Sequence, residues 1–251
     1  MQALVISDIH ANLVALDSVL ADAEEMGFDA VWCLGDVVGY GPDPNACIER
    51  LANLTVPLTC VAGNHDWAVL GRMDDEDFNP EARWAIEWTR AQLTASSRRW
   101  LASLPELPLE RGPCTLTHGS PRIPIYEYIL TPSVALANFA HFTTPYCLVG
   151  HTHLPVIYYL PEDDQGGPSC RALAPSLEYQ IALAGPHRLI LNPGSVGQPR
   201  DGDPRASYAL FDVAEEIWTY RRLAYSFETT QARMRAADLP ERLIARLAYG
   251  W

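Results

Sequence analysis

The chain has 251 residues, with 18 basic and 31 acidic side chains and a formal net charge of −13. Hydrophobic residues make up 48% of the sequence and charged residues 20%, which is typical of a folded protein and excludes wholesale disorder. The negative charge argues against a nucleic-acid polymer as a partner, because its phosphate backbone would be repelled.

The sequence gives no sign of membrane insertion or export. No apolar run approaches the roughly 20 residues that span a bilayer, and the first residues lack the features of a signal peptide. The six cysteines are scattered, and several lie in apolar runs such as 31–34. We interpret them as small buried side chains in a reducing, cytoplasmic setting.

The first third of the chain alternates short apolar runs with helical patterns. Buried strands are predicted at residues 4–6, 31–34 and 58–61. One helix is predicted to follow the N-cap Asn12, and another to follow Asp43, where a proline occupies the first helical position. This alternation indicates an α/β fold with parallel strands.

Residues from about 74 to 104 are predicted to form an inserted helical hairpin. Asn79, which is followed by proline, is a helix-start signal. Trp84 and Trp88 are four residues apart, and a second helical stretch carries Trp100. We expect these tryptophans to pack in the core of the hairpin; the alternative is a wall that faces a substrate.

The rest of the chain is predicted to be rich in strands and to end in a helical tail. Further strands are predicted at 114–117, 146–149, 156–160, 189–191, 207–211 and 217–220. The acidic stretch 162–169 indicates a surface turn, and the tail is predicted over about 227–251 with a break at Pro240. No long linker is present, so 1–251 is predicted to be a single domain.

Five short motifs rich in aspartate and histidine follow predicted strands. They contain seven side chains of the metal-ligand type: Asp8, His10, Asp36, Asn64, His118, His151 and His153. Residues two apart on an extended chain project to the same side, so the first pair and the last pair are each expected to reach one ion. Loops at the carboxyl ends of parallel strands are where open α/β sheets place their ligands.

The ligand types narrow the choice of metal. Carboxylate, imidazole and amide oxygen suit Mn, Fe, Zn, Co or Ni and lack the all-oxygen cage of Ca. Each motif alone has a simpler interpretation, since Asn64 could cap a turn and His118 could be a hydrogen-bonded core residue. Their joint occurrence after strands favours a metal site. His141 and His187 lie outside the motifs and receive no role.

Together the motifs resemble the calcineurin-like metallophosphoesterase superfamily. The resemblance rests on Asp8-Ile9-His10, Gly35-Asp36, Gly63-Asn64-His65-Asp66, Thr117-His118 and Gly150-His151-Thr152-His153. The stretch 192–200 is similar to the small bacterial and archaeal phosphodiesterase branch. The resemblance implies a four-layer α/β/β/α sandwich with two central mixed β-sheets and a two-metal site at their edge.

The resemblance also implies a role for each residue. One ion would be held by Asp8, His10, Asp36 and His153. The other would be held by Asp36, Asn64, His118 and His151, so that Asp36 bridges the pair. His65 matches a histidine beside the leaving group, and Asp66 matches the acid that pairs with it.

The implied activity is hydrolysis of phosphodiesters or small phosphorylated metabolites, with manganese expected to serve best in vitro. Two divalent ions about 3.5–4 Å apart can clamp a phosphoryl group and share a bridging hydroxide that attacks it. Arg200 could bind a phosphate oxygen, or it could form salt bridges with Asp201 or Asp203 in a solvated turn.

Two alternative functions stay open. Protein Ser/Thr phosphatases of this superfamily carry an acid–arginine pair soon after the second motif, whereas residues 35–41 here read GDVVGYG. Tyr40 could instead line a pocket for an organic group, or simply pack. The other alternative is a non-catalytic metal-binding scaffold, against which His65 and the full set of ligand positions argue.

Overall fold

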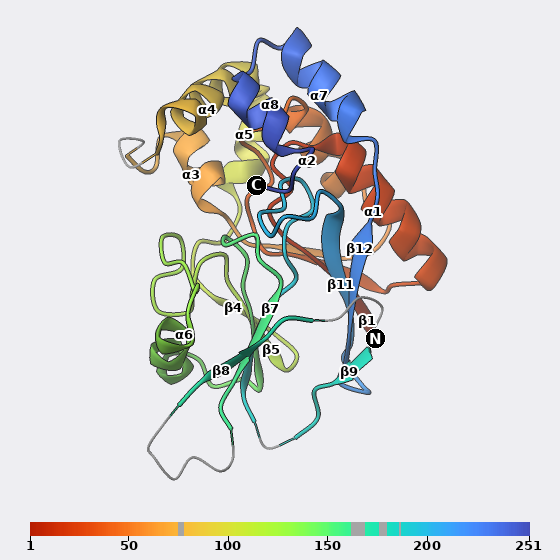
Figure 1. Cartoon of the computed structure of the whole chain (residues 1–251), viewed down its shortest axis with the longest axis vertical. Helices are drawn as coiled ribbons and strands as arrows, with labels where there is room; N and C mark the ends of the chain where they lie inside the picture. Colours follow the sequence, from red (N-terminus) through yellow and green to blue (C-terminus); the bar gives the residue numbers. More distant parts are fainter. Residues whose placement is uncertain (75–77, 162–168, 176–179, 186) are drawn as a thin grey trace.

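The computed structural model of the chain describes residues 1–74, 78–161, 169–175, 180–185 and 187–251. Two six-stranded sheets form its centre, and most helices gather beyond one end and one face of the first sheet, at the top and right of Figure 1. Both sheets mix parallel and antiparallel strands, as predicted.

The first sheet combines strands from both ends of the chain. Its order is β3 (Leu58–Cys60), β2 (Ala30–Cys33), β1 (Gln2–Ile6), β11 (Ala206–Asp212), β12 (Ile217–Leu223) and β9 (Gln180–Ala182). The strands β1, β2 and β3 are parallel, whereas β11 runs antiparallel to β1. The predicted parallel unit is therefore confirmed, and the C-terminal strands extend it.

The second sheet is built from the middle of the chain. Its order is β4 (Leu109–Arg111), β5 (Cys114–Leu116), β6 (Tyr146–Leu148), β10 (Leu189–Asn192), β7 (Val156–Tyr159) and β8 (Arg171–Leu173). The central strands β5, β6 and β10 are parallel, and antiparallel strands flank them.

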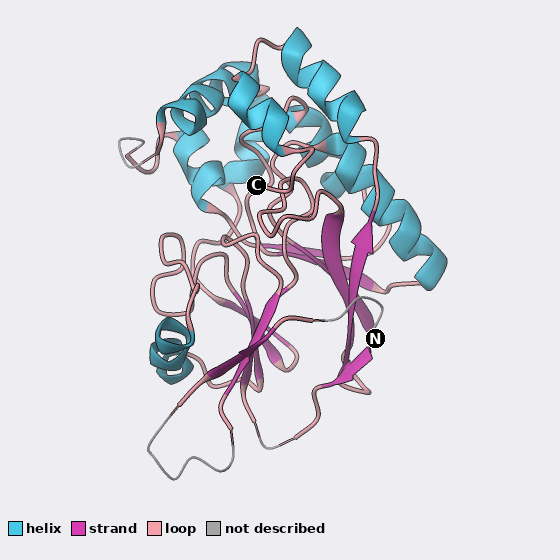
Figure 2. Ribbon diagram, viewed as in Figure 1, coloured by secondary structure: helices cyan, strands magenta, loops and turns pink. Residues whose placement is uncertain are grey.

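Helices cover the outer faces of the sheets, as Figure 2 shows. Those on the side of the first sheet are α1 (Leu13–Met26), α2 (Pro44–Ala52), α3 (Asn64–Leu70), α4 (Pro80–Gln92), α5 (Ala95–Ala102), α7 (Phe227–Ala236) and α8 (Glu241–Arg246). The helix α6 (Pro132–Asn138) and the 3₁₀ turn Phe139–His141 lie beside the second sheet.

Three apolar clusters hold the four layers together. Leu4 and Ile6 of β1 share one cluster with Leu16 of α1, whereas the alternate residue Val5 shares another with Leu148 of the second sheet. This alternation follows from the two-residue period of a strand. A third cluster joins β6 and β10 to α6. The predicted α/β/β/α order is therefore confirmed.

Two of the three predicted helix N-caps form the expected capping hydrogen bond, and the third does not. Asn12 and Asn79 accept hydrogen bonds from the amides of Ala15 and Ala82, as expected of N-caps. Asp43 precedes α2 but makes no capping bond; its carboxylate instead pairs with Arg233 of α7 over 3.1 Å. The elements α3, α6, β4, β8 and β9 were not predicted. The predicted turn at 162–169 lies almost wholly outside the described residues.

The prediction for the tryptophans is wrong in part. Trp84 is 40% exposed, because α4 buries the face that carries Ala82 and Ile86. Trp88 and Trp100 are half-buried, but they pack against two different clusters rather than in a hairpin core of their own.

All six cysteines are free thiols, and five of them are buried. Among the described residues, no helix is both long and apolar enough to cross a bilayer.

The C-terminal helices pack onto α4. Met234, Leu243 and Ile244 lie in one buried cluster with Ala85 of α4 and with Tyr40. Burial of this area contributes to the stability of the whole chain. We therefore propose that 1–251 is a single domain that includes the hairpin and the tail.

If the tail belongs to the core, Leu243→Ala should lower the free energy of unfolding by about 2–5 kcal/mol, because a fully buried leucine leaves a cavity. Urea denaturation would measure the change. Leu107→Ala, at a site that is 73% exposed, is the control and should have an effect within about 0.5 kcal/mol. Equal effects would contradict the packing of the tail.

Candidate metal centre

The aspartate- and histidine-rich motifs meet at one end of the two sheets. Three of them follow the parallel neighbours β1, β2 and β3, and two follow β5 and β6. Backbone bonds join their loops: the Asp8 amide donates to Gly35 O over 3.0 Å, and the Gly150 amide donates to His118 O over 2.8 Å. The loop after β10 adds a bond from the Gly197 amide to Asp8 O.

Five of the seven predicted ligands have left-handed backbone. Their φ angles are 54° at Asp8, 49° at His10, 53° at Asp36, 65° at His151 and 60° at His153. The extended backbone expected in the first and last motifs is therefore wrong: turns, not strand alternation, direct these side chains. Each such residue costs roughly 1–2 kcal/mol. Strain of this kind persists where the surroundings fix the backbone, and it is concentrated at functional sites.

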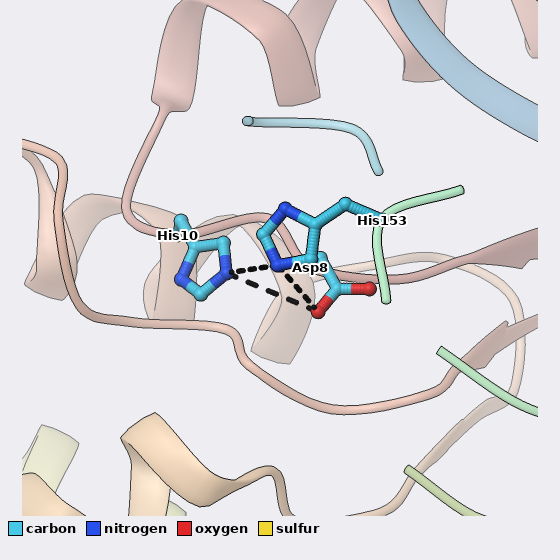
Figure 3. A group of neighbouring side chains, drawn as sticks. All are labelled: Asp8, His10 and His153. Carbon is cyan, nitrogen blue, oxygen red and sulfur yellow. Dashed lines mark hydrogen bonds and ion pairs between the residues drawn. The ribbon is translucent and has the colours of Figure 1, made fainter. Parts of the chain in front are cut away.

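The first donor cluster consists of Asp8, His10 and His153 (Figure 3). The Nε2 atoms of the two histidines are 3.1 Å apart, and Asp8 Oδ1 is 3.3 Å from His153 Nε2 and 3.9 Å from His10 Nε2. All three side chains are buried.

The second donor cluster consists of Asn64, His118 and His151. His118 Nε2 lies 3.0 Å from Asn64 Oδ1 and 3.1 Å from His151 Nδ1. These contacts bring together the loops after β3, β5 and β6.

Asp36 lies between the two clusters. Its Oδ2 atom is 3.6 Å from His10 Nε2 in the first cluster and 3.4 Å from His118 Nε2 in the second. Its Oδ1 atom accepts the His65 amide over 2.8 Å. One carboxylate oxygen thus faces both clusters, while the other is fixed by the backbone.

Backbone carbonyls set the protonation of the first cluster. His10 Nδ1 donates to Val38 O over 3.2 Å, and His153 Nδ1 donates to Gln198 O. A carbonyl can only accept, so the remaining Nε2 atom of each neutral ring carries a bare lone pair. Asp8 Oδ1 accepts no hydrogen bond from any residue that the structure describes. It and the two nitrogens are therefore three buried acceptors that face one another.

Burial and the neighbouring carboxylates shift the pKa values of the donor groups. Burial lowers the pKa of His10 and His153 well below the usual range, and burial raises the pKa of Asp8 to about 7. At His118, burial opposes the charged form, but the Asp36 carboxylate outweighs it and raises the pKa to about 9. A divalent cation would satisfy the bare acceptors of the first cluster, so these residues fit a metal.

His65 and Asp66 do not form the expected pair. The Asp66 carboxylate accepts the Val38 amide over 3.1 Å and the Gly63 amide over 3.0 Å. The His65 ring packs instead against Tyr40, with ring centroids 4.3 Å apart, and its Nδ1 atom has no hydrogen-bond partner in the described parts of the chain. Asp66 therefore fixes two loops rather than orienting the histidine.

Within the described residues, Arg200 forms neither of the two salt bridges considered for it in a solvated turn. Asp201 pairs with Arg222, and Asp203 pairs with Arg205 over 2.6 Å. Arg200 donates to Gln198 Oε1 over 3.1 Å and makes no carboxylate pair in the described part of the chain.

Two further residues beside the centre were missed by the sequence analysis. Tyr128 stacks on His151 with ring centroids 3.6 Å apart, and Arg246 of α8 lines the same cavity as Arg200. Neither belongs to a motif, and only the folding of the tail and of the segment after β5 places them here.

A family model for the calcineurin-like phosphoesterase superfamily domain matches residues 1–216. The chain belongs to this superfamily. A metallophosphoesterase from Sphaerobacter thermophilus has a similar crystal structure, with 47% identity, a TM-score of 0.86, and coverage of 100% of this chain and 99% of that one. A hypothetical protein of Pyrococcus horikoshii shares the fold at 21% identity and a TM-score of 0.81, over 100% and 98% of the two chains.

Sequence relatives add two observations. An uncharacterised protein of Methanocaldococcus jannaschii is 35% identical over 251 residues, which are 98% of this chain and 97% of the relative. A symmetrical bis(5′-nucleosyl)-tetraphosphatase of Pectobacterium atrosepticum is 30% identical over 105 residues, but these cover only 37% of each protein.

The close approach of Gly63 to Asp36 gives a test of the assembly. A Cβ atom at Gly63 would lie 2.1 Å from Asp36 Oδ1, so Gly63→Ala should displace the shared carboxylate and weaken Mn binding at least tenfold in calorimetric titration. Gly185→Ala is the control, since its Cβ would meet nothing nearer than 3.6 Å. Unchanged Mn affinity in a folded Gly63→Ala protein would contradict the role of Asp36.

Proposed function

We propose that the protein is a two-metal phosphoesterase that hydrolyses phosphodiesters or small phosphorylated metabolites. The observation that carries the proposal is the position of Asp36 Oδ2 within 3.6 Å of both donor clusters. Membership of the superfamily supports the same reaction class. Mn, Fe, Zn, Ni and Co all suit the donor set, and we propose Mn as the most effective in vitro.

The donor clusters would hold one ion each. Asp8, His10 and His153 would bind the first, Asn64, His118 and His151 would bind the second, and Asp36 would bridge them. Such ions polarise a phosphoryl oxygen and lower the pKa of bound water, so no serine or cysteine nucleophile is required. The positive charge of two dications would exceed the negative charge of the two carboxylates. The centre would therefore attract a phosphate, although the chain as a whole is negatively charged.

We assign three nearby residues to distinct tasks. His65 would donate a proton to the leaving oxygen, because its ring borders the cavity beside the centre. Arg200, which has no carboxylate partner among the described residues, would hold a phosphate oxygen. Asp66 is a positioning residue: it binds the Val38 amide, and the Val38 carbonyl holds His10.

The two alternative functions receive less support. Residues 35–41 lack the arginine that a protein Ser/Thr phosphatase would use, and the match to bis(5′-nucleosyl)-tetraphosphatases favours a small phosphate ester. A non-catalytic scaffold would not need the full donor set. We further propose a cytoplasmic location with no membrane partner, which is supported by the six free thiols.

The proposed reaction can be tested with bis-p-nitrophenyl phosphate, p-nitrophenyl phosphate and a phosphopeptide, after reconstitution with Mn, Ni, Co or Zn. We expect metal-dependent release of nitrophenol from the diester and loss of activity with a chelator. Selective hydrolysis of the phosphopeptide would favour the phosphatase alternative, and a metal-loaded but inert protein would favour the scaffold.

The role of His65 predicts that His65→Asn lowers kcat more than tenfold while the metal content stays intact, because a proton donor is lost and the ligands are kept. Steady-state kinetics and elemental analysis would measure both. His141→Asn, at an exposed histidine outside the motifs, should change neither. Loss of metal in His65→Asn would instead make His65 a ligand.

A further inference from the structure

Two cavities of different character adjoin the metal centre. The first, of about 210 Å³, has a lining that includes Tyr40, His65, Phe78, Tyr128, Arg200 and Arg246, and we call it the arginine cavity. The second, of about 270 Å³, is lined by Asn64, Met73, Phe78, Ile125, Tyr126, Tyr128 and His151, and we call it the aromatic cavity. Phe78 and Tyr128 border both, so the two cavities are neighbours.

The cavities lie beside opposite donor clusters. The aromatic cavity reaches Asn64 and His151 of the second cluster. The arginine cavity reaches Tyr40 and His65, whose rings lie 4.7 Å and 4.9 Å from the ring of His10 in the first cluster. A ligand that lies across the centre would therefore place one end in each cavity.

The arginine cavity brings together two guanidinium groups that form no ion pair with any described carboxylate. Among the residues that the structure describes, the buried Nε atom of Arg200 has no hydrogen-bond partner, and its guanidinium donates to the neutral oxygens of Gln198 and Tyr40. Arg246 makes no ion pair within the described residues. The Glu81 carboxylate attracts Arg246 electrostatically but forms its ion pair with Arg242, over 3.4 Å.

Two converging cations without a counter-ion are costly in a partly buried site unless an anion joins them. Arginine binds phosphate oxygens with two parallel donors, which makes phosphate the anion that suits this cavity. The aromatic cavity offers rings and aliphatic side chains, which suit an uncharged organic group.

We infer that the arginine cavity binds a second phosphoryl group of the substrate. The preferred substrate class, which rests on the proposed function, is then a phosphate ester with at least two linked phosphoryl groups and an organic group in the aromatic cavity. The reaction stays a hydrolysis: water oxygen joins phosphorus, the P–O bond to the leaving group breaks, and the leaving oxygen takes a proton. Because His65 borders the arginine cavity, the leaving group carries the second phosphoryl.

The test compares two chromogenic esters that differ in the number of phosphoryl groups, the p-nitrophenyl ester of thymidine 5′-monophosphate and the γ-p-nitrophenyl ester of thymidine 5′-triphosphate. The metal-loaded wild type should hydrolyse the triphosphate ester with a kcat/KM at least tenfold higher than that for the monophosphate ester. Chromatography would follow all the products. Arg246→Gln should lower this preference about tenfold or more, because charge-assisted bonds to phosphate are lost. Arg246→Lys should restore part of it.

Arg242→Gln is the matched control, since Arg242 lies one turn earlier on the same helix, is 75% exposed in its side chain, and pairs with Glu81. It should leave the preference within twofold. A preference for the monophosphate ester in the wild type, or an equal preference in folded Arg246→Gln and Arg242→Gln proteins, would overturn the inference.

Failure of the proposed function would look different. If the metal-loaded wild type hydrolyses neither ester, the enzyme proposal fails, and the cavity is tested by calorimetric binding of inorganic triphosphate. Binding at least tenfold weaker in Arg246→Gln than in Arg242→Gln would support the anion cavity, and equal binding would overturn it.

Discussion

The centre of this protein depends on one electrostatic constraint. Asp8 Oδ1 and the Nε2 atoms of His10 and His153 are acceptors that face one another in a buried site, and no described residue donates a hydrogen bond to Asp8 Oδ1. Such an arrangement is unfavourable in a low-dielectric interior unless a cation occupies it. The constraint reaches the second cluster through Asp36, whose Oδ2 atom faces both groups of donors. Positive charge between the two clusters would stabilise the convergence of these seven side chains.

The two sheets make this convergence possible. Parallel strands deliver the motif loops to one edge, and the apolar clusters on both faces of each sheet offset the strain of the left-handed turns. The helices that follow β12 bring Arg246 into the same cavity as Arg200, so the C-terminal tail takes part in both the core and the cavity.

Much of this was predictable, and the exceptions have physical causes. The strands, the helix-start signals at Asn12 and Asn79, and the grouping of the motifs follow from local pattern. The edge strands β8 and β9 are short and partly exposed, so they carry no apolar run. The grouping of the ligand side chains was predicted from strand alternation, but left-handed turns direct them instead. Such turns leave no periodic pattern in the sequence. Arg246 and Tyr128 could not be found, since tertiary packing alone brings them to the site.

The most direct test of the central claim is the number and position of bound ions. Crystals of the Mn-loaded protein, measured at the manganese absorption edge, would locate the ions by anomalous scattering, and elemental analysis would count them in solution. We expect two ions for each chain, one on either side of Asp36 Oδ2. A single ion, or ions away from Asp36, would contradict the shared carboxylate on which the account rests.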